Sequence, residues 1–150
     1  MRQFKTVEEA HDICVAEGNV IPIDNADLEK IKSCIKISEE DLQSAKEAVG
    51  KKRWNSAYKM YYDVLHQLVE VFLRFKKVKV KNHLCLFAYL CVKHPEMELN
   101  WDFFEKVRTK RNGINYYGNP VTEKDWKEVS LEFQLNINLL KNKISEKLEE

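Results

Sequence analysis

The sequence predicts an all-α protein: an antiparallel up-and-down helical bundle with four to five core helices and a helical N-terminal extension. Along several long segments, apolar residues recur at spacings of three and four, which is the period of one helix face. The chain has only four glycines and three prolines among its 150 residues, too few for the frequent turns of a sandwich or barrel. No run of alternating apolar and polar residues indicates a strand.

Residues 1–24 are predicted to form an extension that packs on the bundle, and the bundle itself occupies residues 25–150. Thr6 is a favourable N-cap for a first helix that ends near Gly18. An extended segment, Val20 to Ile23, follows this helix. We therefore expect the extension to add one short helix to a single domain.

The second helix is predicted to be long, with Asp24 or Asn25 as its N-cap and Gly50 as its stop. Ser38 and the acidic residues after it offer an alternative helix start within this segment. A third helix is predicted over residues 55–75, and its wide apolar stripe indicates a central position. That stripe contains Ala57, Tyr61, Leu65, Leu68 and Phe72, and Tyr58, Tyr62, Val69 and Val71 widen it.

The remaining helices follow at short intervals. Asn82 opens a fourth helix that runs through Val92, and Asn100 caps a fifth. The tripeptide 118–120, Gly-Asn-Pro, breaks the chain after the fifth helix. Thr122 caps the last helix, whose apolar face contains Trp126, Val129, Phe133, Ile137, Leu140 and Ile144.

Length and composition describe one globular domain. A chain of 150 residues can bury a real core, and 44% hydrophobic with 33% charged residues is typical of globular proteins. No apolar run approaches the roughly 20 residues of a membrane-spanning helix. The first residues lack the apolar region of a secretion signal. We therefore expect a cytoplasmic protein with no membrane contact.

The charge is unevenly distributed along the chain. Residues 51–111 contain 14 Lys or Arg against 6 Asp or Glu, whereas the remainder contains 11 against 18. Such an asymmetry can mark a face that binds polyanions. The run from Arg74 to Lys81 is better explained as the solvated end of a helix. Lys106, Arg108 and Lys110 are stronger candidates for a binding face, because they flank Arg111.

The four cysteines are Cys14, Cys34, Cys85 and Cys91, and no two of them form a C-x-x-C pair. All lie in apolar, helical surroundings, so we expect four buried free thiols. His11 and Cys14 could share a helix face, but two ligands do not make a metal site. We predict no metal site and no cofactor.

Arg111 is the most informative residue. Phe104, Val107, Arg111 and Ile114 fall at spacings of three and four, so the arginine lies in an apolar helix stripe. Burying a guanidinium is costly unless its N–H donors find acceptors. Arg111 therefore either binds a ligand or bonds within the bundle; for the second case, Asp63 and Glu70 are the candidate carboxylates.

The segment from Arg111 to Tyr117 resembles the signature of HEPN domains, small helical proteins of prokaryotes and some eukaryotes. That family places an arginine, a polar residue that is often asparagine, a short spacer and then a histidine. Arg111 and Asn112 match, and Tyr116 occupies the histidine position. The resemblance extends over residues 38–147 and includes Lys81-Asn82-His83-Leu84, which is similar to a Lys-x-His helix start. Residues 42–58 are similar to the first helix, its turn and the entry into the second helix.

The resemblance implies a four- or five-helix bundle, commonly a symmetric dimer, and a nucleotidyltransferase partner in toxin–antitoxin or stress systems. Active members resemble metal-independent ribonucleases in which the arginine and histidine of two protomers line a shared cleft. The implied catalytic residues here are Arg111, Asn112 and Tyr116. The implied contacts to RNA or nucleotide are Arg111, Asn112, Lys106, Arg108, Lys110 and His83.

Tyr116 makes catalysis the weaker expectation. Because a phenol ordinarily has a pKa of about 10, tyrosine is a poor general base at pH 7. The leading hypothesis is a HEPN-like homodimer that binds RNA, a nucleotide or a nucleotidyltransferase through the Arg111 face, with little or no catalysis. The alternatives are a metal-independent endoribonuclease toxin and a structural interaction module without a nucleotide role.

Overall fold

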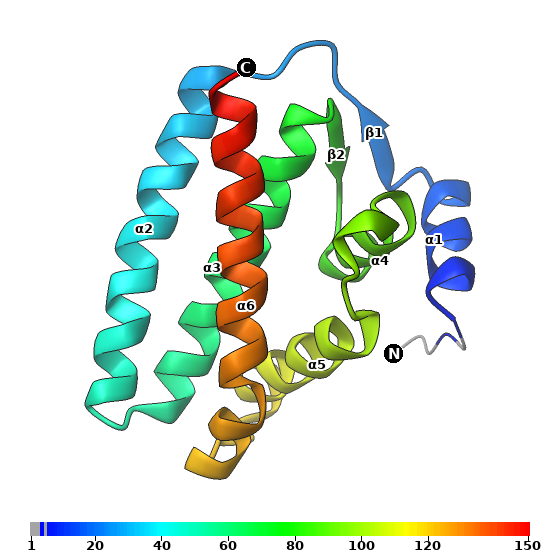
Figure 1. Cartoon of the computed structure of the whole chain (residues 1–150). Helices are drawn as coiled ribbons and strands as arrows, with labels where there is room; N and C mark the ends of the chain where they lie inside the picture. Colours follow the sequence, from blue (N-terminus) through cyan, green and yellow to red (C-terminus); the bar gives the residue numbers. More distant parts are fainter. Residues whose placement is uncertain (1–3, 5) are drawn as a thin grey trace.

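The fold class predicted from the sequence is confirmed: the chain is a helical bundle with one small sheet (Figure 1). This computed structural model describes Phe4 and residues 6–150. Within those residues, a two-stranded sheet and a short 3-10 helix accompany the α-helices. The elements are α1 (Val7–Ala16), β1 (Val20–Pro22), α2 (Leu28–Gly50), α3 (Trp54–Phe75), β2 (Val78–Val80), α4 (His83–Lys93), η1 (Pro95–Met97), α5 (Trp101–Tyr117) and α6 (Glu123–Leu148).

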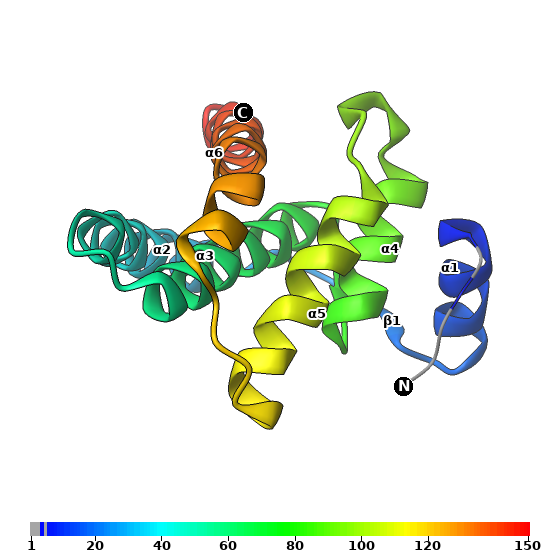
Figure 2. The same cartoon turned by 90° about the horizontal axis from the view of Figure 1, so that it is seen from below.

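α3 is the central helix of the bundle, as its wide apolar stripe predicts. Eleven of its 22 residues are buried. α2 and α6 run alongside α3, and α4 and α5 pack on it from another side, with α5 crossing the lower end of the bundle (Figures 1 and 2). The tyrosines on α3, including Tyr58 and Tyr62, are buried among these helices. They are core residues and offer no exposed ring for a base.

Side-chain caps begin most helices where the sequence predicts them. The Thr6 hydroxyl accepts a hydrogen bond from the Glu9 N–H (3.1 Å) and begins α1. The side chains of Asn82 and Asn100 begin α4 and α5 in the same way. Thr122 and Asp125 form a reciprocal capping box at the start of α6. These starts are encoded within three residues of sequence, which is why they are predictable.

The predicted N-cap of α2 is wrong, and the alternative helix start at Ser38 is not used. The N-cap is Asp27, whose carboxylate accepts from the Lys30 N–H, instead of Asp24 or Asn25. The helix also continues through Ser38 without a break. The Ser38 hydroxyl donates to the Ile35 carbonyl (2.7 Å), so it is satisfied inside the helix and does not compete for a new cap.

The run from Arg74 to Lys81 does more than end a helix. After α3, Lys77 adopts a left-handed conformation (φ 61°) and turns the chain. The valines that follow form β2, which pairs antiparallel with β1 so that Val20 faces Val80. The sequence predicts the extended segment from Val20 to Ile23, but its pattern indicates no strand. The two strands pair across a long stretch of sequence, so their pairing depends on the fold.

The expectation of four free thiols is wrong for Cys14 and Cys85, which form a disulfide with a Cα–Cα distance of 5.7 Å. These cysteines are 71 residues apart, and the packing of α1 on α4 brings them together. Cys34 and Cys91 are free thiols. Burial raises the pKa of the Cys91 thiol to about 12, so this thiol is unreactive at neutral pH.

α1 lies on the outer side of α4, on the opposite side of the molecule from α2 (Figures 1 and 2). β1 follows α1 and joins it to the bundle through β2. Within the described part of the chain, no helix combines the length and the apolar character needed to cross a lipid bilayer.

Candidate functional site

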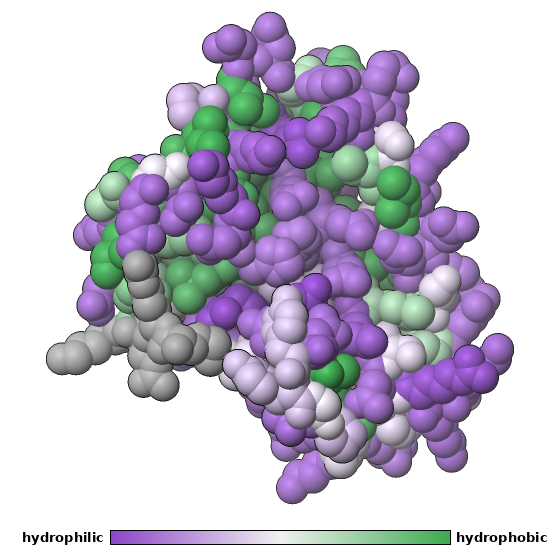
Figure 3. Space-filling view, turned by 180° about the vertical axis from the view of Figure 1, so that it is seen from behind, coloured by the Kyte–Doolittle hydropathy of each residue, from purple (hydrophilic) through white to green (hydrophobic). Residues whose placement is uncertain are grey.

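A surface cavity of about 520 Å³ opens where the N-terminal end of α4, the C-terminal half of α5 and the residues after α1 come together. Its polar lining includes Asn19, Lys81, His83, Arg111 and Asn112. The C-terminal half of α5 points to the rear of the molecule, where hydrophilic residues dominate the surface (Figures 2 and 3). The cavity is therefore an open, polar site formed by three segments that are distant in sequence.

Arg111 lies in the cavity wall and rests on α3. Phe104 and Val107 are fully buried and hold this face of α5 against the core, as the stripe predicts. The Arg111 guanidinium carbon lies 5.3 Å from the centroid of the Tyr62 ring, within the range of a cation–π contact. The buried phenol ring thus supports the guanidinium from one side and leaves the other side to the cavity.

The polar contacts of Arg111 are few and long. Its Nη2 atom is 3.9 Å from Asp63 Oδ1, and its Nη1 atom donates to Asn112 Oδ1 at 3.4 Å. Its Nε atom is buried and has no hydrogen-bond partner among the described residues. Of the two carboxylates proposed to neutralise Arg111, Asp63 is in weak contact and Glu70 is paired with His66 (3.1 Å). The guanidinium is positioned, but its donors are far from saturated.

Burial and neighbouring charges shift the pKa values of the carboxyl groups near Arg111. The pKa of Asp63 is raised, mainly by burial and against the attraction of Arg111. The pKa of Glu70 is lowered, because the hydrogen bond and charge of His66 outweigh its burial. Glu70 is therefore ionised beside His66, whereas Asp63 lies 3.9 Å from Arg111, too far for a hydrogen-bonded ion pair.

His83 is the first residue of α4 and lines the same cavity as Arg111. Its Nδ1 atom shares a hydrogen bond with the Tyr62 hydroxyl (2.9 Å). Its ring lies against that of His66, with 3.8 Å between the ring centroids. Burial, followed by the charges of His66 and Arg111, lowers the pKa of His83 to about 4. At pH 7 its ring is neutral.

The sequence reasoning missed Tyr62 and His66 as neighbours of the site, and it named Glu70 only as a possible partner of Arg111. These residues follow one another at intervals of four along α3, so they lie on one helix face. The signal in the sequence is this interval of four, which places a row of polar side chains on one face of an otherwise apolar helix. Tyr62 contacts both Arg111 and His83, and this contact links the candidate residues of α4 and α5.

The structure brings five of the predicted site residues to this cavity. Tyr116 lies at its rim with its side chain largely exposed, and Asn112 contacts Arg111. Arg108 also lines the cavity, but its guanidinium is paired with both oxygens of Glu105 at 2.9 Å. The five residues are His83, Arg108, Arg111, Asn112 and Tyr116.

Lys106 and Lys110 lie elsewhere. Lys106 pairs with Glu128 (3.5 Å) and Lys110 with Asp125 (3.2 Å), both on α6. These lysines line a different cavity of about 550 Å³ on the other side of α5. Because residues 106 and 110 are four apart, they share one helix face, and the rotation of α5 turns that face away from Arg111.

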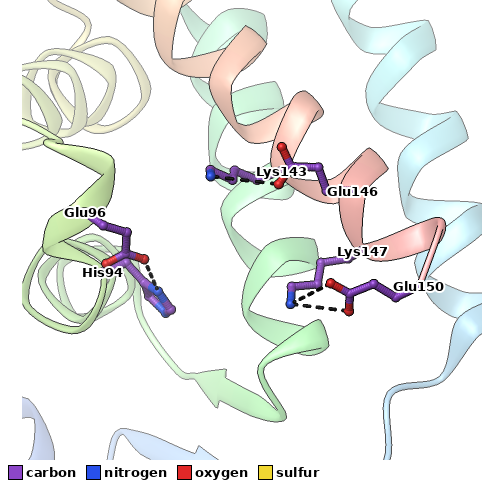
Figure 4. A network of polar contacts seen from close by, with 6 residues as sticks. All are labelled: His94, Glu96, Lys143, Glu146, Lys147 and Glu150. Atoms are coloured by element: carbon purple, nitrogen blue, oxygen red, sulfur yellow. Dashed lines mark hydrogen bonds and ion pairs between the residues drawn. The ribbon is translucent and has the colours of Figure 1, made fainter.

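A second cluster of polar side chains lies near the C-terminus, and it does not resemble the cavity around Arg111 (Figure 4). Its two lysines and His94 each contact a carboxylate, and its side chains are mostly exposed, so it is a set of surface polar contacts. Its members are His94, Glu96, Lys143, Glu146, Lys147 and Glu150. Within the described residues, no group of three or more His, Cys, Asp or Glu side chains is arranged to hold a metal ion.

Comparison of the chain with protein-family models, with curated protein sequences and with solved structures finds no match in any of the three. The HEPN resemblance therefore stays a prediction, carried by the residues quoted for it.

Proposed function

We propose that the Arg111 cavity binds a phosphate group of single-stranded RNA or of a nucleotide, with little or no catalysis. The observation that carries this proposal is the state of Arg111. Its guanidinium is held on the Tyr62 ring, and its nearest carboxylate is 3.9 Å away. A phosphate in the cavity can accept two parallel hydrogen bonds from this planar donor.

The other residues of the cavity suit the same ligand. Lys81 adds a second positive charge, and Asn19 and Asn82 add amide groups. Tyr116, at the rim with 69% of its surface exposed, offers a ring on which a base can stack. One cavity therefore offers positively charged side chains to a phosphate and an aromatic ring to the attached base.

The resemblance to HEPN domains extends the proposal to the assembly. It favours a homodimer in the cytoplasm and a nucleotidyltransferase as a protein partner. Tyr116 in place of the family's histidine favours a role in binding, because a phenol is a poor proton acceptor at pH 7.

A second candidate function is a metal-independent endoribonuclease, and one observation favours it. Arg111 and the neutral His83 line the same cavity of a single chain. His83 would accept the proton of a ribose 2′-hydroxyl as the 2′-oxygen attacks phosphorus and the 5′-oxygen leaves with a proton from water. Arg111 would stabilise the charge on the phosphoryl oxygens.

Fluorescence anisotropy with a labelled 12-nucleotide single-stranded RNA at low salt tests the proposal. We expect Arg111→Ala to weaken binding by about tenfold, which corresponds to one lost charge-assisted contact. Lys106→Ala is the matched control, since it removes one positive charge from the same helix but from its other side. Equal effects of the two substitutions would show non-specific attraction and would reject the Arg111 cavity.

The same samples test the second candidate. We expect the wild-type protein without added metal to leave a mixed RNA substrate intact on a denaturing gel. Cleavage that is lost in both Arg111→Ala and His83→Gln would instead establish the ribonuclease.

A further inference from the structure

The disulfide between Cys14 and Cys85 lies in the wall of the cavity. Both cysteines line it, and Cys85 follows His83 by two residues in the first turn of α4. The Asn19 amide also contacts the Cys85 sulfur, at 3.7 Å. The bond therefore fastens the end of α1 to the part of α4 that carries a predicted ligand contact.

The segment fastened in this way is acidic. Residues 7–19 contain four Asp or Glu and no Lys or Arg. One of these acids, Glu17, lines the cavity together with Lys81 and Arg111. Cys14 of α1 and Glu17, directly after the helix, form part of the wall, so this acidic segment limits the room for a polyanion and adds negative charge near it.

The packing of α1 without the disulfide is limited. The helix has ten residues, and its buried side chains are Ala10, His11 and Cys14. A helix of this length is marginal without tertiary contacts. His11 adds a cost, because its Nδ1 atom is buried without a hydrogen-bond partner among the described residues. Beyond α1, the extension is held by a sheet of three residue pairs.

We propose that this disulfide is a redox latch: reduction frees α1 from the cavity wall and increases the affinity of the cavity for single-stranded RNA. The inference rests on the proposed function. In the oxidised protein, the end of α1 and Glu17 after it occupy part of the cavity wall and hinder the ligand. In the reduced protein, α1 detaches about the β1 connection and exposes Lys81, His83 and Arg111 to a longer strand.

The chemistry requires a dithiol reductant. One thiolate of the reductant attacks a sulfur of the disulfide, the S–S bond breaks, and the other cysteine leaves as a thiolate that takes up a proton. The second thiol of the reductant, as a thiolate, then attacks the reductant's own sulfur in the mixed disulfide, and the remaining protein cysteine leaves as a thiolate that takes up a proton. The protein gains two electrons and two protons as two thiols, and the reductant becomes a disulfide. Since disulfides are rarely stable in the cytosol, the open state would prevail there and oxidation would close the cavity.

Anisotropy with the labelled 12-nucleotide RNA compares oxidised and dithiothreitol-reduced wild-type protein at low salt. We expect reduction to tighten binding by about threefold or more, because the cavity opens and the acidic segment 7–19 moves away from the ligand. The Cys14→Ser/Cys85→Ser variant should bind like the reduced protein under both conditions. The matched control, Cys34→Ser/Cys91→Ser, keeps the disulfide and should respond to reduction as wild type does.

Hydrogen exchange on the same samples measures the release of α1 in the absence of RNA. Reduction should remove amide protection from Val7–Ala16 while amides of α3 stay protected, which also shows that the bundle remains folded. Unchanged protection of α1, or RNA binding that is Arg111-dependent but equal or weaker after reduction, would overturn the latch and leave the proposed function standing. Absence of RNA binding in both redox states would overturn the proposed function and, with it, the control of affinity.

Discussion

The guanidinium of Arg111 lies over the buried ring of Tyr62, 5.3 Å from its centroid, and the hydroxyl of the same tyrosine bonds His83. One residue of α3 therefore positions the candidate groups of both α4 and α5. The ring and the hydroxyl act on different partners, so substitutions can separate their contributions.

Tyr62→Phe keeps the ring and removes the hydroxyl. We expect RNA affinity to change by less than about twofold, and the free energy of unfolding to fall by about 1 kcal/mol, because the half-buried His83 loses its partner. Tyr62→Leu should weaken RNA binding further, since it also removes the surface under Arg111. Urea denaturation and anisotropy measure the two effects, and equal affinity of the Leu and Phe variants would refute the role of the ring.

His83 should make the protein less stable as the pH falls. Burial and the nearby charges of His66 and Arg111 lower its pKa to about 4 in the folded protein, against 6.5 for an ordinary histidine. Between these values the unfolded chain binds more protons than the folded one, so stability is full above pH 6.5 and declines toward pH 4. Because the group is partly solvated, we expect a loss of about 1 kcal/mol.

Urea denaturation at pH 7 and pH 4.5 measures this dependence. His83→Gln cannot titrate, yet its amide can still bond Tyr62, so it should lose less stability across this range. His11 remains in both proteins and, since burial also lowers its pKa, contributes equally to both. The same pH dependence in the variant and the wild type would exclude His83 as the cause.

Tyr116 should contribute to RNA binding through its ring. We expect Tyr116→Phe to bind like wild type and Tyr116→Ala to bind about five- to tenfold more weakly, consistent with about 1 kcal/mol for one stacked base. Tyr117→Ala serves as the control, because that neighbour is equally exposed but does not line the cavity. A stronger effect at Tyr117 would place the stacking surface outside the cavity.

The chain should form a homodimer. On α6, Leu131 and Leu135 are largely exposed one turn apart, which leaves an apolar strip on a helix whose other face is in the core. Sedimentation velocity at micromolar concentrations should show a dimer, and Leu131→Ser/Leu135→Ser should shift it toward monomer. A monomer at all concentrations would contradict the prediction, and a dimer insensitive to the substitutions would locate the interface elsewhere.

The sequence by itself determined the helices and much of their order. A cap such as Asn82 or Thr122 acts on an N–H group within three residues, and an apolar stripe such as that of Arg111 repeats within one helix. These are local interactions, so the chain specifies them before it folds. The start of α2 differs from the prediction because Asp24, Asn25 and Asp27 are all good caps, and the structure uses Asp27, whose carboxylate accepts from the Lys30 N–H.

The tertiary structure alone decided which residues share the cavity. Arg111 meets Tyr62 and His83 because α3, α4 and α5 pack together, and Lys106 is excluded because of how α5 is rotated. The disulfide of Cys14 has the same origin: its partner is 71 residues away and becomes adjacent only when α1 packs on α4. A sequence pattern reports the period of each helix, whereas helix packing sets the faces that meet, because burial of the apolar stripes fixes their mutual orientation.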